Sequence, residues 1–536
     1  MTDKLKIFQV FTIAGKQLAS KAARKSAPSN TSIPLRAPTE DESEYETEGY
    51  SSKPKNFMDL KQSLLHLIST DIIFNTQLQS EITILHSEFK SWNQSLPHST
   101  ISQILSYFGV SPQWVSFFHR FLEASLRFSD QPSSSSRTRQ RGVPEDHVLS
   151  NVFSELVLFC LDYSINQSTN GQQLFRFQGD LWFWSPSQEA CVNAWKSTSE
   201  FSAVMGINLD EVKSGSAQFH NQEMMSVEIS PELPNGPIRW GFLVLKQDES
   251  GKGRFIIDQS IVSTQISSLK EHLFPTTGKR QSIFTWIKAW NTYASKFFST
   301  NFGIPANCYG REHVDDILYT LQRMQSEIFV DHGGSVTSYL KAELQERFGI
   351  TDIPDGFLYF ATYLGGLELH SPFIPFLSIR DGLPTDPYTV IQDFHEKERE
   401  NYEEAKDDFD HDRVDREGMI PEPHWIPENF KERDEFFSFE EYKDWREEFS
   451  WDLDGDLARK FEYLLERATE RPLSDEMNIA NDLAKSSVGT VTPYEKWVAQ
   501  LYGPEMVKRF GRFNIADKSW LPVGMVSLFK DGRLKV

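Results

Sequence analysis

The sequence predicts an α+β protein with antiparallel strands, a long helical region and an acidic helical extension. Three features carry this prediction. Residues 174–184 read as two aromatic-rich arms around Gly179 and Asp180, which is the composition of a two-residue β-hairpin turn. A Gly/Pro turn leading into residues 240–245 indicates a second hairpin. Elsewhere apolar residues recur at helical spacing, as Leu60, Leu64 and Ile68 do, and a Ser-Pro cap predicts a helix over residues 111–126.

The chain is long enough for several domains. Its 536 residues allow two to four, and a hydrophobic content of 39% supports packed cores. We expect five consecutive segments. They are a disordered basic arm with its linker (1–55), an α+β domain (56–245), a helical region (246–388), an acidic helical segment (389–475) and a partly packed C-terminal tail (476–536).

The N-terminal arm and the cysteines indicate an intracellular protein. Residues 1–36 contain seven Lys or Arg and one acid, and they favour Lys over the Arg that is typical of mitochondrial transit peptides. Cys160, Cys191 and Cys308 are far apart and odd in number, so they read as reduced thiols. No apolar run approaches the ~20 residues of a membrane span. We therefore expect a nuclear or cytoplasmic protein without a membrane partner.

Acidic charge is concentrated in one part of the chain. The formal net charge is −21, and residues 393–456 alone hold 25 acidic and 9 basic residues. A charged, solvated helical face is the simplest interpretation of this segment, and a surface for a protein partner is the alternative. The total charge argues against simple wrapping of nucleic acid, but it does not describe the charge of any local groove.

Four short motifs follow one another in an order that suggests chemistry. A β-prone run ends at Glu88, a Gly-Val-Pro segment begins at Gly142, the first hairpin carries Asp180, and a glycine turn leads to Lys213. This order resembles motifs A to D of the reverse-transcriptase palm domain. In that family, motif A ends a strand with a metal-binding acid, motif B approaches the template, motif C is an acidic hairpin, and motif D ends in a lysine.

Longer matches make the chain similar to a group of fungal reverse-transcriptase-like proteins, over roughly residues 56–387. Those proteins carry an Arg-Gly-Val-Pro segment, an Asp-Asp-Leu-Trp-Phe-Trp hairpin, an Ile-Arg-Trp-Gly-Phe segment and a Leu-Gly-Gly-Leu-Glu-Leu segment. The corresponding positions here are 141–144, 179–184, 238–242 and 364–369. Within the third of these, Trp240 and Gly241 resemble the primer-grip hairpin, motif E.

The resemblance implies a palm over residues 56–245, a thumb-like region over 246–388, and RNA-directed DNA polymerase chemistry with Mg²⁺ on an RNA/DNA template-primer. Two Mg²⁺ ions would activate the primer hydroxyl and stabilise the leaving pyrophosphate. The implied metal ligands are Glu88 and Asp180, and the implied proton donor is Lys213. The implied nucleic-acid-binding residues are Arg137, Arg139, Arg141, Gly142, Pro144, Trp240 and Gly241.

The sequence departs from the family pattern at catalytic positions. Motif A has Glu88 in place of Asp, and the extra methylene displaces the carboxylate oxygens by ~1 Å, an error that is costly in catalysis. Gly179 replaces the first Asp of motif C, so a principal metal ligand is missing. Asp146 replaces the motif B glycine, and Asn93 replaces the aromatic residue that screens the sugar. We expect the fold to be kept and polymerase activity to be impaired.

Three functions remain open from the sequence. The first is a degenerate reverse-transcriptase-like protein that binds nucleic acid and polymerises poorly or not at all. The second is an active Mg²⁺-dependent polymerase, and the third is an interaction scaffold that uses the acidic segment. The site residues also have plainer interpretations: Asp180 as a turn carboxylate, Glu88 as a strand-end surface acid, Lys213 as a solvated lysine, and the arginines as part of a solvated loop.

Overall fold

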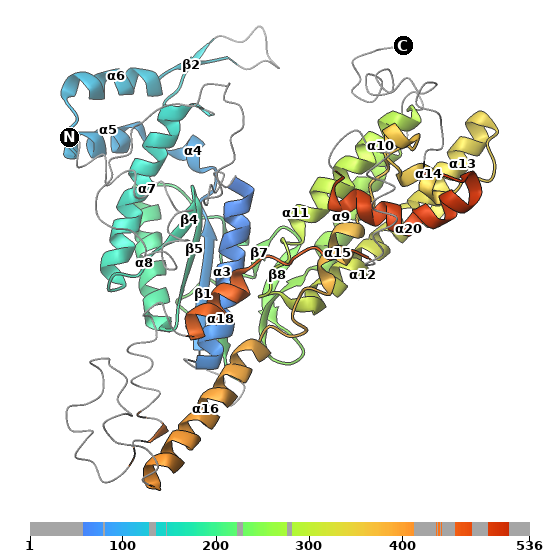
Figure 1. Cartoon of the computed structure of the whole chain (residues 1–536). Coiled ribbons are helices and arrows are strands. Elements are labelled where there is room, and N and C mark those ends of the chain that lie inside the picture. The colour runs from blue at the N-terminus through green and yellow to red at the C-terminus, as the bar shows by residue number, and fades with distance from the viewer. Residues whose placement is uncertain are drawn as a thin grey trace, which may run out of the picture. The chain divides into compact units, whose positions relative to one another are not determined.

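The computed structural model divides the chain into two compact units (Figure 1). It describes residues 57–78, 81–127, 136–145, 147–221, 229–275, 281–411, 456–473 and 491–513, together with residues 436, 438, 439 and 441. The first unit extends to Ile238 and includes Tyr388–Tyr463, and the second comprises Arg239–Pro387 and resumes at Leu464. Each unit mixes helices with antiparallel strands, so the protein belongs to the α+β class. The predicted arm, residues 1–55, lies outside the described residues.

A four-stranded antiparallel sheet forms the centre of the first unit, in the order β4-β5-β1-β6. Its strands are β1 (Glu81–Glu88), β4 (Phe175–Phe177), β5 (Asp180–Ser185) and β6 (Gly215–His220). Strand β1 lies between β5 and β6, and its residues between the two ends are all buried. An alternation of buried and exposed residues is therefore not expected along β1, because helices cover both faces of the sheet.

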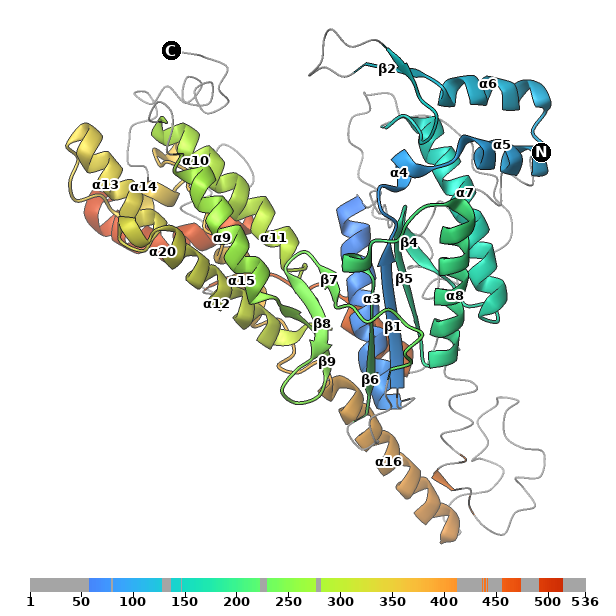
Figure 2. The same cartoon turned by 180° about the vertical axis from the view of Figure 1, so that it is seen from behind.

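Helices α7 and α8 cover one face of this sheet, and α3 covers the other, as the two opposite views agree (Figures 1 and 2). The elements of the first unit outside the sheet are α3 (Phe57–Leu78), α4 (Trp92–Ser95), α5 (His98–Tyr107), α6 (Pro112–Leu122), β2 (Ser125–Leu126), β3 (Arg137–Thr138), α7 (Val148–Ser168), α8 (Gln188–Met205), the 3₁₀ turn η1 (Glu211–Lys213) and α16 (Thr389–Asp410). The helix predicted over 111–126 ends at Leu122, because Ser125 and Leu126 pair with β3 instead.

Helix α7 is the core helix of this unit. By length and composition alone it could cross a membrane, so it is an exception to the expectation drawn from the sequence. Phe153 and Leu158 are buried in the cluster of apolar side chains between the helices and the sheet. Arg176 of β4 forms ion pairs with Glu155 and Asp162 of α7, each at 2.7 Å. These contacts join α7 to the sheet, as expected for a helix packed inside a folded domain.

The first hairpin turns one residue earlier than the sequence suggested. Phe177 pairs with Asp180, so the two turn residues are Gln178 and Gly179, and Asp180 is the first residue of β5. Gln178 has a positive φ of 54°, a conformation that two-residue hairpin turns require at their first position. Asp180 is therefore a strand residue whose side chain projects from one face of the sheet, and its interpretation as a turn carboxylate is wrong.

The second unit begins with a three-stranded sheet in the order β7-β8-β9. Its strands are β7 (Ile238–Trp240), β8 (Leu243–Gln247) and β9 (Gly253–Ile257). Its helices are α9 (Gln259–Leu273), α10 (Ile283–Thr292), the π-helix η2 (Tyr293–Phe297), α11 (Phe298–Asn301), α12 (Gly310–Ile328), η3 (Val330–His332), α13 (Val336–Phe348), α14 (Asp355–Tyr359), η4 (Thr362–Leu364), α15 (Ile374–Arg380) and α20 (Pro493–Phe510), and α18 (Asp456–Leu465) spans the boundary between the units.

The predicted acidic segment, residues 393–456, is described only in part. Helix α16 covers its beginning and contacts α3. Residues 412–435 and 442–455, which carry much of the negative charge, lie outside the described residues. A protein partner for this segment therefore stays a prediction from the sequence.

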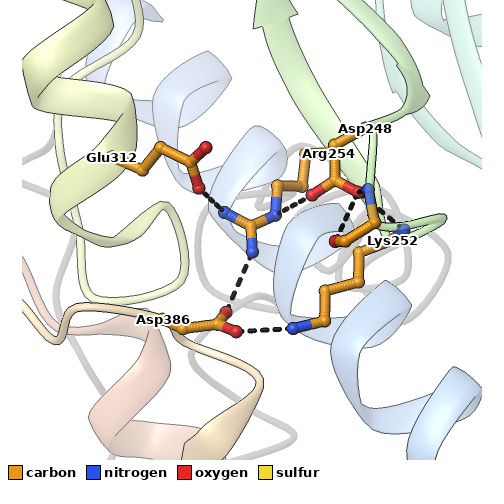
Figure 3. Close-up of polar contacts among 6 residues, drawn as sticks. Asp248, Lys252, Arg254, Glu312 and Asp386 are labelled. Atoms are coloured by element: carbon orange, nitrogen blue, oxygen red, sulfur yellow. Dashed lines mark hydrogen bonds and ion pairs between the residues drawn. The ribbon is translucent and has the colours of Figure 1, made fainter.

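One arginine holds the β8–β9 hairpin to the rest of the second unit (Figure 3). The Arg254 guanidinium lies 2.9 Å from carboxylate oxygens of Asp248, Glu312 and Asp386. Lys252 makes a second ion pair with Asp386, at 2.5 Å. The three acids come from the hairpin, from α12 and from the segment after α15, so Arg254 connects three parts of the unit.

We expect Arg254→Leu to destabilise the second unit by about 2–3 kcal/mol, because it leaves the largely buried Asp248 without its guanidinium partner. The matched control is Lys341→Met, which removes an exposed ion pair with Asp355 and should cost less than about 1 kcal/mol. Urea unfolding of both variants measures the difference. Equal losses of stability would contradict a structural role for Arg254.

Candidate functional site

The two carboxylates predicted as metal ligands lie opposite each other on neighbouring strands. Glu88 is the last residue of β1, Asp180 is the first residue of β5, and the antiparallel register pairs them directly. Residues paired in this way project from the same face of a sheet, with Cβ atoms ~4.5–5.5 Å apart. Two strand termini therefore bring together side chains that are far apart in the sequence.

The turn after α8 brings Lys213 to the same place. Helix α8 ends at Gly206, which has a left-handed conformation, and the following residues run beside the end of β1. The Asp210 amide donates a hydrogen bond to the Glu88 carbonyl at 2.8 Å, and the Lys90 amide donates to the Asn208 carbonyl at 2.8 Å. Lys213 then places its Nζ 2.7 Å from Oε2 of Glu88.

Asp180 has two partners that the sequence reasoning missed. His86 Nε2 lies 2.9 Å from one carboxylate oxygen of Asp180, and Lys61 Nζ lies 3.3 Å from the other. His86 precedes Glu88 by two residues on β1, so the period of a strand places both on one face and could have identified it. Lys61 comes from α3, 119 positions away from Asp180, and no local pattern points to it.

Cationic side chains of the first unit neutralise the two carboxylates. Burial by itself would raise the pKa of Asp180, but the hydrogen bond and charge of His86, together with Lys61, outweigh it and hold this pKa below its ordinary value. The hydrogen bond from Lys213 to Glu88 raises the pKa of the lysine, and the negative charge of Asp180 adds to this rise. Both carboxylates are thus neutralised by cationic side chains of the same unit.

Gly179 is packed beneath aromatic side chains. A Cβ atom at this position would lie 3.0 Å from Cβ of Trp92 and 3.4 Å from Cβ of Phe89. The Gly179 carbonyl also accepts a hydrogen bond from the Phe89 amide at 2.9 Å. Trp92 is itself held by a 2.6 Å hydrogen bond from its indole to Ser154 on α7. An aspartate at position 179 would therefore need Trp92 or its neighbours to shift by a few tenths of an ångström.

The side chains that could bind a metal ion in this region do not suit a pair of Mg²⁺ ions. Among the described residues, no group of three or more His, Cys, Asp or Glu side chains is arranged to hold a metal ion. Glu88 and Asp180 supply carboxylate oxygens, but each is already bound by a lysine. Mg²⁺ requires near-octahedral oxygen coordination, and ammonium groups repel it.

The Arg-Gly-Val-Pro segment packs against the residues that follow β1. Gly142 has a φ of +81°, and a Cβ there would come within 2.5 Å of the Gln94 carbonyl oxygen. The Gly142 amide donates to the Leu96 carbonyl at 2.7 Å, and its own carbonyl lies 2.8 Å from Nε2 of His98. Pro144 is half-buried. The glycine thus has a structural reason, which is the close approach of two backbone segments.

The three arginines predicted to bind nucleic acid differ in their surroundings. The Arg141 guanidinium donates to the carbonyls of Met205 and Gly206, at 3.0 and 2.7 Å, and so caps the end of α8. Arg137 lies on β3 and is exposed, whereas Arg139 is half-buried. The motif B residue Asp146 lies outside the described residues. A role in binding phosphate stays a prediction for these arginines.

Trp240 and Gly241 belong to the second unit. Gly241 has a φ of +57°, and a Cβ there would lie 2.8 Å from the Asn301 carbonyl oxygen. That carbonyl accepts a hydrogen bond from the Phe242 amide at 2.9 Å. Gly241 therefore allows the strand connection to approach α11, and Trp240 beside it is half-buried on β7.

Comparisons with known proteins give weak likenesses. No protein-family model matches the chain, and no curated protein matches its sequence. Among solved structures it is similar to apo telomerase from Candida tropicalis, at 10% identity and a TM-score of 0.28, over 54% of this chain and 47% of that one. It is also similar to telomerase from Candida albicans in complex with the TWJ fragment of telomeric RNA, at 12% identity and a TM-score of 0.23, over 54% and 53% of the two chains. The chain thus spans about half the length of these structures, and TM-scores this low do not establish a shared fold.

We expect Lys61→Met to destabilise the first unit more than Lys213→Met. Lys61 faces Asp180, whose side chain is only 16% exposed, so its removal should cost about 1–3 kcal/mol. Lys213 is 52% exposed, and its loss should cost less than about 1 kcal/mol. Chemical unfolding monitored by tryptophan fluorescence compares the two variants.

The pH dependence provides a second readout of the same prediction. A lowered pKa of Asp180 contributes stability above its ordinary value of 3.8, and this contribution is lost as the pH falls through the lowered value. In Lys61→Met the pKa of Asp180 moves back toward 3.8, so the contribution is smaller and is lost at a higher pH. Identical acid-unfolding curves for the variant and the wild type would refute the pairing.

Proposed function

We propose that the first unit is a reverse-transcriptase-like palm that binds nucleic acid but does not extend a primer. The arrangement of its sheet supports this proposal. The end of β1 carries Glu88, the neighbouring β5 carries Asp180, the Gly142 segment packs beside the residues that follow β1, and the turn after α8 delivers Lys213. These placements support the proposal because the same segments carry the sequence resemblance to motifs A to D.

The observation that carries the proposal is the internal neutralisation of the acid pair. Lys213 binds Glu88, and Lys61 with His86 binds Asp180. In a polymerase palm, cations held by such carboxylates clamp the attacking and the leaving oxygen. A lysine supplies one charge and three N–H donors at a fixed place, so it stabilises the acid pair without supplying the Lewis acid that phosphoryl transfer uses.

The packing of Gly179 supports the same conclusion independently. The family's principal carboxylate would stand at this position, where even a Cβ atom would lie only 3.0 Å from Cβ of Trp92. Binding does not need that carboxylate. Indeed, two uncompensated carboxylates would repel a phosphate backbone, whereas the lysine-neutralised pair does not.

Primer extension tests the absence of activity. We expect the full chain to incorporate no nucleotide on an RNA template with a DNA primer, with either Mg²⁺ or Mn²⁺, under conditions in which a known reverse transcriptase extends the same substrate fully. Asp180→Asn should behave like the wild type. Robust incorporation that Asp180→Asn abolishes would overturn the proposal and restore the active-polymerase alternative.

Binding to an RNA–DNA hybrid duplex tests the other half of the proposal. We expect the affinity to fall as salt rises, with a linear relation between the logarithms of the binding constant and the salt concentration, because phosphate contacts release counterions. Fluorescence anisotropy of a labelled hybrid measures this. If the full chain binds no hybrid at the lowest ionic strength at which it is soluble, the nucleic-acid assignment fails.

A further inference from the structure

Helix α6 presents aromatic side chains to solvent in the first unit. Trp114 is 56% exposed and Phe117 is 53% exposed, and their ring centroids are 5.7 Å apart. They are supported from beneath, because Trp114 stacks on Phe118 at 5.9 Å and Phe118 contacts the buried Phe153 at 5.3 Å. The two exposed rings are therefore held in place by the core.

The packing of α6 does not require these exposed rings. Other apolar residues of α6 pack against the core of the first unit. They are the buried Leu122 and the half-buried Val115, Phe118 and Phe121. Helix α6 lies beside α5 (Figures 1 and 2). Neighbouring exposed aromatic residues on a soluble protein commonly mark a binding surface.

Basic charge accompanies the aromatic side chains. Phe117 follows Trp114 by three positions and Arg120 follows Phe117 by three, so each neighbours the next on the helix surface, and we call these three residues the ribbon. Within residues 98–145, the described positions hold five arginines and two glutamates, in a chain whose net charge is −21. The arginines are Arg120, Arg127, Arg137, Arg139 and Arg141, and the glutamates are Glu123 and Glu145.

We propose that the ribbon of Trp114, Phe117 and Arg120 is a stacking platform for single-stranded nucleic acid. Aromatic rings that stack on bases, next to cations that meet the backbone, are the means by which proteins hold single strands without reading sequence. This inference rests on the proposed function, because it specifies a further surface for the same class of ligand. We expect little sequence preference, since every base offers a π-face.

Charge favours this occupant over a second copy of the chain. In a two-fold dimer across α6 the ribbon would pack against its own copy, and Trp114, Phe117 and Arg120 include no acid that could pair with Arg120. A nucleic-acid backbone is complementary to that charge.

The experiment measures anisotropy of a labelled, mixed-sequence single strand with the full chain. We expect Trp114→Ala and Phe117→Ala each to weaken binding by roughly 5- to 100-fold, the range that base–aromatic stacking spans. Trp114→Phe keeps a ring and should stay within about 3-fold of the wild type, because any aromatic ring can stack on a base.

Arg120→Gln tests the charge of the ribbon and should reduce by about one the slope of the logarithm of the binding constant against the logarithm of the salt concentration. Tyr319→Ala, which removes an exposed aromatic side chain of the second unit, is the matched control and should change nothing.

The outcomes separate the platform from the proposed function. If the wild type binds the hybrid duplex, and the alanine variants bind the single strand as well as the wild type does, the platform is refuted and the proposed function stands. If the wild type binds neither ligand, both fail. If Trp114→Ala and Phe117→Ala dissociate a dimer, measured by light scattering, without changing nucleic-acid binding, a second copy occupies α6 and the platform is refuted. Loss of single-strand binding with hybrid binding retained supports it.

Discussion

Two carboxylates at paired positions of adjacent strands must have a counter-charge. At the cross-strand spacing their repulsion is strong wherever water is partly excluded. In the described residues the counter-charge comes from the chain itself. Lys213 reaches Glu88 from the turn after α8, and Lys61 reaches Asp180 from the helix on the other face of the sheet. The same ion pairs therefore hold α3 and the turn after α8 against the sheet and neutralise the two carboxylates.

The sequence predicted the strands of the site and part of its chemistry. The run ending at Glu88 is a strand, and the aromatic hairpin pairs with it so that Glu88 meets Asp180. The turn was misplaced by one residue, because Gly179 suits either turn position and composition does not choose between them. Lys213 could be connected to the acids only through the family resemblance, and the hydrogen bonds between residues 208–210 and the end of β1 give the physical reason for its position.

The remaining partners depend on tertiary neighbours that no local pattern encodes. Lys61 is one polar residue on a long helix, and only the docking of α3 gives it Asp180 as a partner. Arg141 belongs to a basic cluster that the sequence predicts to bind phosphate, and the fold adds a role that the sequence did not indicate, because its guanidinium caps α8. An arginine can bind a phosphate or cap a helix. The sequence alone does not show which hydrogen-bond acceptors the fold places near its guanidinium.

The contact between Gly179 and Trp92 constrains which substitutions position 179 accepts. A side chain at position 179 would need Trp92, which is held through its hydrogen bond to Ser154, to shift. Any side chain at position 179 is therefore coupled to the size and position of the side chain at position 92.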